Sequence, residues 1–272
     1  MMGDRLTKKQ LDLPSYRTLY LEGGDASGSA PILFLHGWGM TTAPYRRSLN
    51  LLCQHYRVIA PDLPGFGKAK YPQYLTHHLS YVEPLISLLD ALSLSKVHLV
   101  GHSGGGAVAI ALAATHPSRV SSLVLTDSTG IPLGSFPKVL LLRVRELLLE
   151  IPKIKPIPLL KFVYALLYNG VFNTGNVLKA AQLALQRDLR PLLPQVQAPT
   201  LVLWGGGDRF IPLQMAYEFA EHIPHAKSII VEGEYHEWAM LRPEKFVPLV
   251  LSFLDEVEGI KDSSSDRGAS LI

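Results

Sequence analysis

Short runs of apolar residues recur along the chain, and a stretch with helical periodicity follows most of them. The clearest runs consist mainly of Val, Ile and Leu with little alternation with polar residues, and they span 32–37, 57–65, 96–101, 122–127, 200–208 and 228–233. Near-continuous apolar runs of this length are typical of strands buried on both faces of a parallel sheet. Residues 16–22 are predicted to form an edge strand that begins the sheet.

Helical patterns lie between these strands, over about 79–92, 104–116, 213–222 and 243–257. Strands that alternate with helices predict an α/β fold with a mostly parallel central sheet flanked by helices. The alternation breaks once, between residues 131 and 195, where the pattern is mainly helical and contains no strand-like run. The final residues, 261–272, are predicted to form a disordered tail.

Composition narrows the class of protein. The chain has 272 residues, of which 47% are hydrophobic and 18% charged, as expected for a globular protein with a large core. The net charge of +3 is too small to indicate a nucleic-acid partner. Cys53 is the single cysteine, so an internal disulfide is excluded. Because neither a signal peptide nor an apolar window of spanning length is visible, we expect a cytoplasmic protein.

The stretch VHLVGHSGGGAVAIALAA (97–114) contains the pattern Gly101-x-Ser103-x-Gly105. Alone the pattern is weak, since roughly one chain in ten of this length would contain it by chance. Here it follows a predicted strand and precedes a predicted helix, a setting that places a serine on a tight turn with its hydroxyl exposed. The two glycines lack Cβ atoms and so allow strand and helix to approach. Ser103 is therefore a candidate nucleophile, with a plain strand-to-helix turn as the alternative.

A nucleophilic serine needs a base, and four histidines follow it in the chain. His116, His222 and His225 lie at predicted helix ends. His236 lies in a loop between the last strand and the last helix, at the sheet edge where open α/β sheets bind their ligands. We therefore favour His236 as the base, with a solvent-exposed loop histidine as the alternative.

The base in turn needs an acid that orients its imidazole. Asp208 ends the strand that precedes His236, and we favour it for this role. Asp127 is the rival, because it ends the strand next to that of the nucleophile. A simple turn residue after three glycines is the alternative reading of Asp208.

A developing oxyanion needs hydrogen-bond donors. In HGWGM (36–40), Gly37 and Gly39 bracket Trp38 at the end of the first core strand, so that the backbone N–H of Trp38 is free to point into the site. The second predicted donor is the N–H of Gly104, directly after the nucleophile at a helix N-terminus. A glycine-rich turn at a strand end is the alternative.

Together, LFLHGWG, APDLPGFGKA, LVGHSGGG, LVLWGGGD and YHEWAMLRPEKF resemble the α/β-hydrolase fold family over about residues 16–257. The resemblance implies a core domain from 1–130 and 196–260 and a helical cap over 131–195, inserted after the sixth strand, that roofs the active site. Three positions depart from the family pattern: Lys68 stands where a serine or small residue is more usual, Tyr235 replaces a frequent glycine, and Glu237 follows His236. A carboxylate so close would raise the imidazole pKa if it faces the site.

These residues predict a serine hydrolase that cleaves a carboxylic ester, thioester or lactone with an apolar moiety through an acyl-enzyme on Ser103. A carbon–carbon bond hydrolase of the same fold and a low-turnover binding protein are the alternatives. No motif for a metal or cofactor is present, so the predicted partner is a small-molecule substrate.

The predicted cap is unusually basic. Residues 131–195 hold nine Lys or Arg against three Asp or Glu, a net charge of +6. In KVLLLRVRELLLEIPKIK (138–155) the basic residues are interspersed with leucine, as in helices that lie on anionic membranes. We therefore hypothesise a cap surface that contacts anionic lipid or attracts an anionic substrate, with a solvated helix face as the alternative.

Overall fold

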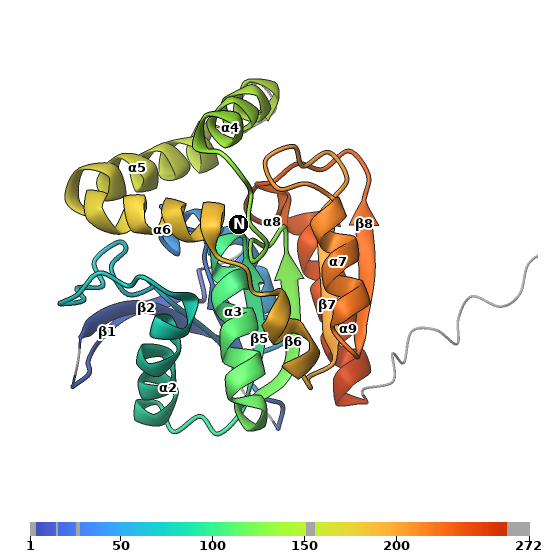
Figure 1. Ribbon diagram of the computed structural model, residues 1–272. Helices are drawn as coiled ribbons and strands as arrows, with labels where there is room; N and C mark the ends of the chain where they lie inside the picture. The colour runs from blue at the N-terminus through green and yellow to red at the C-terminus, as the bar shows by residue number, and fades with distance from the viewer. Residues whose placement is uncertain (1–3, 15, 26–27, 151–155, 260–272) are drawn as a thin grey trace, which may run out of the picture.

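A single eight-stranded sheet forms the centre of the computed structural model, which describes residues 4–14, 16–25, 28–150 and 156–259 (Figure 1). Its strand order is β1-β2-β4-β3-β5-β6-β7-β8. The strands are β1 (Thr7–Asp12), β2 (Arg17–Gly23), β3 (Ile32–Leu35), β4 (Val58–Pro61), β5 (Val97–His102), β6 (Val120–Thr126), β7 (Thr200–Gly205) and β8 (Ala226–Val231). The predicted tail, 261–272, lies outside the described residues.

Six neighbouring strands of the sheet run parallel to one another: β4, β3, β5, β6, β7 and β8. At one edge, β2 pairs antiparallel with β4, and β1 pairs antiparallel with β2. Every residue of β3, β4, β5 and β7 is buried, as the continuous apolar runs predicted. The prediction that residues 16–22 form the edge strand is wrong, because β2 pairs with β4 on one side and with β1 on the other. The sequence did not predict β1, whose residues TKKQLD are mostly exposed and therefore show no apolar face.

Helices cover both faces of the sheet and divide the core in two. One hydrophobic cluster contains α2 (Val82–Ala91), α3 (Gly104–Thr115) and α7 (Gln214–His222), which lie on the near face in Figure 1. The other contains α1 (Arg46–Leu52), α8 (Trp238–Leu241) and α9 (Pro243–Glu258). Short 3₁₀ helices at Ala43–Tyr45, His78–Tyr81, Pro117–Arg119 and Arg190–Gln195 connect these elements. The predicted α/β-hydrolase fold is therefore confirmed.

Three helices are inserted between β6 and β7: α4 (Phe136–Glu150), α5 (Pro156–Phe172) and α6 (Thr174–Gln186). They lie across the carboxyl ends of the parallel strands, above the N-terminus of α3 (Figure 1). Ligands of open α/β sheets bind at this edge, so the insertion lies over the expected site. Among the described residues, no helix combines the length and apolar character needed to cross a membrane.

Candidate active site

The turn between β5 and α3 holds Ser103 in a conformation that few residues adopt. Its φ of 54° and ψ of −123° lie outside the broad allowed regions. A Cβ atom on Gly101 would lie 2.6 Å from the Cα of Gly106, and one on Gly105 would lie 2.3 Å from the carbonyl oxygen of Leu35. Both glycines are therefore required by backbone contacts, and the sharp turn directs the serine side chain to the sheet edge.

Ser103, His236 and Asp208 form a chain of hydrogen bonds. The Nε2 atom of His236 lies 3.1 Å from the Oγ atom of Ser103, and its Nδ1 atom lies 2.8 Å from Oδ2 of Asp208. All three residues are buried. The structure thus brings together the three residues that the sequence singled out, from the ends of β5, β7 and β8.

Burial controls the ionisation of this chain. It lowers the pKa of His236 to about 3, and the positive charge of Arg143 acts in the same direction. The imidazole is therefore neutral at neutral pH and is able to accept a proton. Burial raises the pKa of Asp208 to about 7, while backbone N–H groups of Ile211 and Phe210, 2.7 and 2.8 Å from Oδ1, stabilise its charged form.

Asp127, the rival acid, hydrogen-bonds the carboxyl group of Asp208, whereas Asp208 is the partner of His236. The Oδ1 atom of Asp127 accepts the backbone N–H of Gly205 at 2.8 Å, and its Oδ2 atom accepts the indole N–H of Trp238 at 2.6 Å. Burial, followed by the charge of Asp208, raises the pKa of Asp127 well above its usual range. Its contacts join the ends of β6 and β7 to α8, which is a structural role.

The turn after β3 packs against the nucleophile turn. A Cβ atom on Gly37 would lie 3.2 Å from Cβ of Ser103, and one on Gly104 would lie 2.2 Å from the indole ring of Trp38. The two predicted oxyanion donors, the N–H groups of Trp38 and Gly104, therefore come from adjacent segments. The indole of Trp38 also stacks on His78, with ring centroids 5.3 Å apart.

His102, next to the nucleophile in sequence, is occupied elsewhere. Its Nδ1 atom lies 2.7 Å from the hydroxyl of Tyr45, and its Nε2 atom lies 2.9 Å from the carbonyl oxygen of His236. It thus supports the loop that carries His236 and does not contact the hydroxyl of Ser103.

Two residues of α4 that the sequence reading did not single out reach this site. Arg143 forms an ion pair with Glu237, and Glu146 is fully buried against the loops after β7 and β8. The expectation for Glu237 is therefore corrected, because its carboxylate faces Arg143. The carboxylate that raises the pKa of His236 is that of Glu146. Spacing within the chain carries no signal for either contact.

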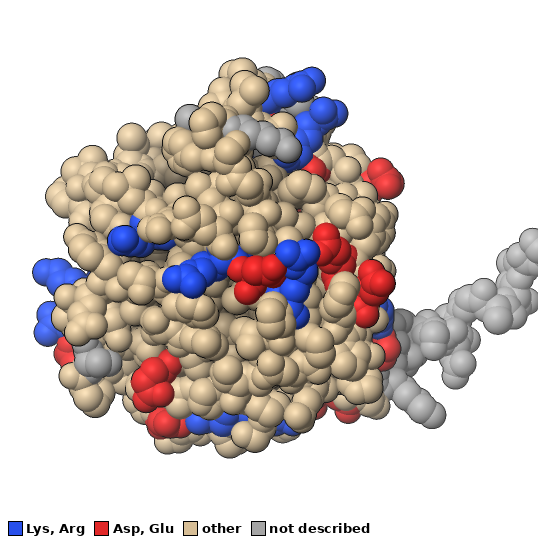
Figure 2. Space-filling model, in the orientation of Figure 1, with Lys and Arg blue, Asp and Glu red and all other residues tan. Residues whose placement is uncertain are grey.

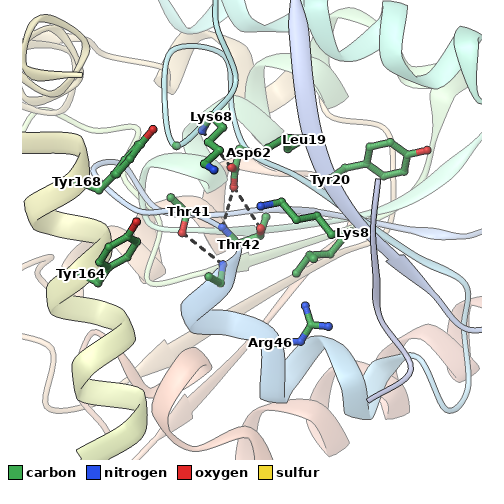
Figure 3. A pocket seen from close by; sticks show the side chains of 13 residues that line it. Lys8, Leu19, Tyr20, Thr41, Thr42, Arg46, Asp62, Lys68, Tyr164 and Tyr168 are labelled. Carbon is green, nitrogen blue, oxygen red and sulfur yellow. Dashed lines mark hydrogen bonds between the residues drawn. The ribbon is translucent and has the colours of Figure 1, made fainter. Parts of the chain in front are cut away.

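A cavity of about 290 Å³ lies between the insertion and the β1–β2 edge (Figure 3). Tyr164 and Tyr168 line it from α5, and Asp62 lines it from the core. Asp62 accepts hydrogen bonds from the backbone N–H of Thr42 at 3.0 Å and from that of Lys68 at 3.4 Å. None of the three hydrogen-bonded site residues lines this cavity. Its polar centre ties together the loops that follow β3 and β4.

Comparison with known proteins agrees with this architecture. The sequence profile of the alpha/beta hydrolase family matches residues 32–249. The chain is 31% identical to a 2-hydroxymuconate semialdehyde hydrolase of Pseudomonas putida, over 90% of this chain and 93% of that protein. It is 29% identical to Lipase 1 of Psychrobacter immobilis, over 81% of this chain and 75% of that protein.

Solved structures show the same relationship. A membrane phospholipase A superposes with a TM-score of 0.79 at 28% identity, covering 94% of this chain and 87% of that one. A serine hydrolase of carbazole degradation superposes with a TM-score of 0.77 at 26% identity, covering 92% and 99%. With this fold and this family match, the chain belongs to the alpha/beta hydrolase family.

Proposed function

We propose that Ser103, His236 and Asp208 form the catalytic triad of a serine hydrolase. The hydrogen-bonded chain from Ser103 through His236 to Asp208 is the observation that carries this proposal. His236 removes the proton of the serine hydroxyl as Ser103 attacks the substrate carbonyl, and then returns it to the leaving group. Water, activated by the same imidazole, hydrolyses the acyl-enzyme. Asp208 orients the imidazole and stabilises its charged form.

The backbone N–H groups of Trp38 and Gly104 stabilise the oxyanion in this mechanism. Gly104 contributes from the first turn of α3, where the helix dipole also favours negative charge. Gly37 lies so close to Ser103 that a side chain there would crowd the site. Loss of one such donor typically lowers the rate about 100- to 1,000-fold.

We infer that the substrate is a carboxylic ester with an apolar moiety. Phe210 meets the ring of His236 edge-on, with ring centroids 4.9 Å apart, and a Cβ atom on Gly39 in the oxyanion turn would lie 3.8 Å from the side chain of Leu166 in α5. Arg143, the cation of the insertion beside the triad, is already paired with Glu237. Apolar surroundings and a neutralised cation favour an uncharged acyl group.

Carbon–carbon bond hydrolysis is the second candidate. Several relatives are named as hydrolases of 2-hydroxy-6-oxo-dienoates or related compounds. They include the 2-hydroxymuconate semialdehyde hydrolase described above and a 2-hydroxy-6-oxo-6-phenylhexa-2,4-dienoate hydrolase of Comamonas testosteroni. The same triad serves both reactions, so the choice rests on the substrate that the pocket accepts.

A substrate panel on the purified protein tests both candidates. We expect p-nitrophenyl esters of intermediate acyl length to be hydrolysed faster than a 2-hydroxy-6-oxo-dienoate, and a fluorophosphonate probe to label the protein. Ser103→Ala should abolish labelling and reduce turnover about 10⁶-fold. Faster cleavage of the dienoate would favour the second candidate. A folded wild-type protein that resists the probe and hydrolyses neither class would overturn the triad proposal.

A further inference from the structure

Two buried polar side chains of the insertion reach the loops that carry the site. Glu146 projects from α4 and Asn169 from α5, and both are completely inaccessible to solvent. Buried polar groups of this kind are costly unless they are fully hydrogen-bonded, so what they bind is informative. Each binds backbone groups of the core, in opposite halves of the site.

Glu146 binds both the acid loop and the base loop. Its Oε2 atom accepts the N–H groups of Arg209 and Phe210 at 2.6 and 2.9 Å, directly after Asp208. Its Oε1 atom accepts the N–H of His236 itself at 3.1 Å. One carboxylate thus joins the loop of Asp208 to the loop of His236, whose side chains are hydrogen-bonded with Oδ2 and Nδ1 2.8 Å apart.

Arg143 strengthens this contact one turn earlier on α4. It pairs with the buried carboxylate of Glu237, and its guanidinium lies 5.0 Å from the ring centre of Phe210. Its Nη1 atom lies 3.7 Å from Oε1 of Glu146. The one positive charge of Arg143 therefore lies near two carboxylates, and the three backbone N–H groups supply the direct hydrogen bonds to Glu146.

Asn169 binds the oxyanion half of the site. Its side-chain N–H₂ group donates to the carbonyl oxygens of Gly39 and Met40, both at 3.0 Å. Its carbonyl oxygen accepts the N–H of Gly67 at 2.8 Å. The turn that holds Trp38 is thereby fixed to α5 and to the loop after β4.

We propose that the insertion completes the active site through these two anchors: Glu146 positions the loops of Asp208 and His236, and Asn169 positions the oxyanion turn. The triad and the oxyanion donors are then correctly placed when the insertion is docked, and are loosened when it is displaced. The inference rests on the proposed serine-hydrolase function. Glu146 and Asn169 act through other residues and are therefore positioning residues.

Hydrogen exchange combined with kinetics tests the Glu146 anchor. In Glu146→Ala the amides of Arg209 and His236 lose their acceptor, while that of Phe210 keeps Asp208, so peptides that contain Arg209 or His236 should exchange faster. Because misplacement by about 1 Å can cost about 100-fold in rate, kcat should fall roughly 10- to 100-fold with a smaller change in KM. Glu146→Gln retains one oxygen acceptor and can therefore bind only one of the two loops, so it should restore exchange protection and kcat in part. Arg145→Ala, on the exposed side of α4, is the matched control and should behave as wild type.

The pH profile separates positioning from general destabilisation. The groups that face His236 are Asp208, His102 and, from α4, Arg143 and Glu146. Activity needs the neutral imidazole of His236 beside the ionised carboxylate of Asp208, so it is lost as pH falls through the apparent pKa values of this pair. Since Glu146 raises the pKa of His236 and Arg143 lowers it, Glu146→Gln should move the acid limb of kcat/KM to lower pH. Arg143→Met should move it to higher pH.

Asn169→Ala tests the second anchor. It removes the donors to Gly39 and Met40 without touching the charges around His236. We expect kcat to fall about 10-fold, a fraction of the loss of a whole oxyanion donor, with no shift of the acid limb. Asn169→Asp keeps the acceptor for Gly67 but loses both donors, and should not restore kcat.

Distinct outcomes separate this inference from the function on which it rests. Unchanged exchange and unchanged kcat in Glu146→Ala would overturn it, and so would faster exchange with full activity. If Glu146→Ala does not fold, an unshifted acid limb in Glu146→Gln is contradictory evidence. A wild-type protein without hydrolase activity whose loops still lose protection in Glu146→Ala would refute the proposed function and leave the anchor intact.

Discussion

Two apolar helices, α3 and α5, approach the active site from opposite sides, and they use their apolar residues differently. In α3 every residue from Gly104 to Ala114 is buried. In the described part of α5, Phe162, Ala165 and Asn169 are buried, while large apolar side chains face outward. Those outward residues are Leu160, Val163, Tyr164, Leu166, Leu167, Val171 and Phe172, each at least 40% exposed.

The difference follows from what packs on each helix. The sheet contacts α3 on one side, and α2 and the 3₁₀ segment Arg190–Gln195 contact it on others, so its residues are buried all round. Among the described elements α5 packs mainly on α6 and the short helix Ala43–Tyr45, and Asn169 binds the loops after β3 and β4, while many of its other side chains are exposed. An apolar sequence is thus buried by packing in α3, whereas in α5 it forms an exposed apolar surface.

The largest effect is expected from adding one methyl group to the tightly packed helix α3. Gly105→Ala would place a Cβ atom 2.3 Å from the carbonyl oxygen of Leu35 and 2.6 Å from that of His36. Both are backbone atoms of the central sheet region and cannot move without disturbing it. We expect a loss of stability of about 3 kcal/mol or more, together with loss of activity. Urea unfolding followed by circular dichroism measures it, and a change below about 1 kcal/mol would show that the helix is not tightly held.

A second test places charge on the exposed surface of α5. In the face shown, the surface over α5 is largely free of charged side chains, whereas basic side chains lie near α4 and along α6 (Figure 2). The double variant Leu160→Glu/Leu167→Glu changes residues that are 70% and 64% exposed, so stability should change by no more than about 0.5 kcal/mol per site. If this surface meets lipid, binding to vesicles containing anionic lipid should weaken at least about tenfold.

Co-sedimentation with such vesicles at several salt concentrations provides the measurement. A wild-type protein that never sediments would exclude the membrane hypothesis, and acyl-chain preference would then be the property to compare. The membrane hypothesis rests in part on the basic residues of α4. One of them, Arg143, faces inward and pairs with Glu237, so it does not belong to a basic outer surface. Lys153 and Lys155 lie outside the described residues.

The contrast between the two helices also explains what sequence could predict. Strands buried on both faces and the glycine-constrained turn at Ser103 leave strong local patterns, and so the core fold and the meeting of Ser103, Asp208 and His236 followed from the sequence. The edge strand β1 escaped notice because its residues are mostly exposed. The helix α1, Arg46–Leu52, also went unpredicted, since its seven residues are too few to show a clear period.

The insertion was predictable as a helical region but not in its contacts. Glu146 and Asn169 have no motif around them, and Glu146 reads as one more charge on a leucine-rich helix. Their role depends on hydrogen bonds to backbone N–H and C=O groups that lie 63 to 130 residues away in the chain. Local propensity carries no information on such contacts, so side chains that act across the boundary between insertion and core emerge with the three-dimensional structure.

The smallest expected effect is the counterpart of the first, on the other helix. Gly170 lies within α5 at an exposed position, and a Cβ atom there would meet nothing within 4 Å. Gly170→Ala should therefore stabilise the protein by about 0.5–1 kcal/mol, because alanine loses less backbone entropy in a helix. The neighbouring anchor Asn169 keeps its contacts, so kcat should be unchanged. The same unfolding assay measures the gain. A loss of stability would mean that α5 packs against a partner at this position, and that its apolar surface is covered after all.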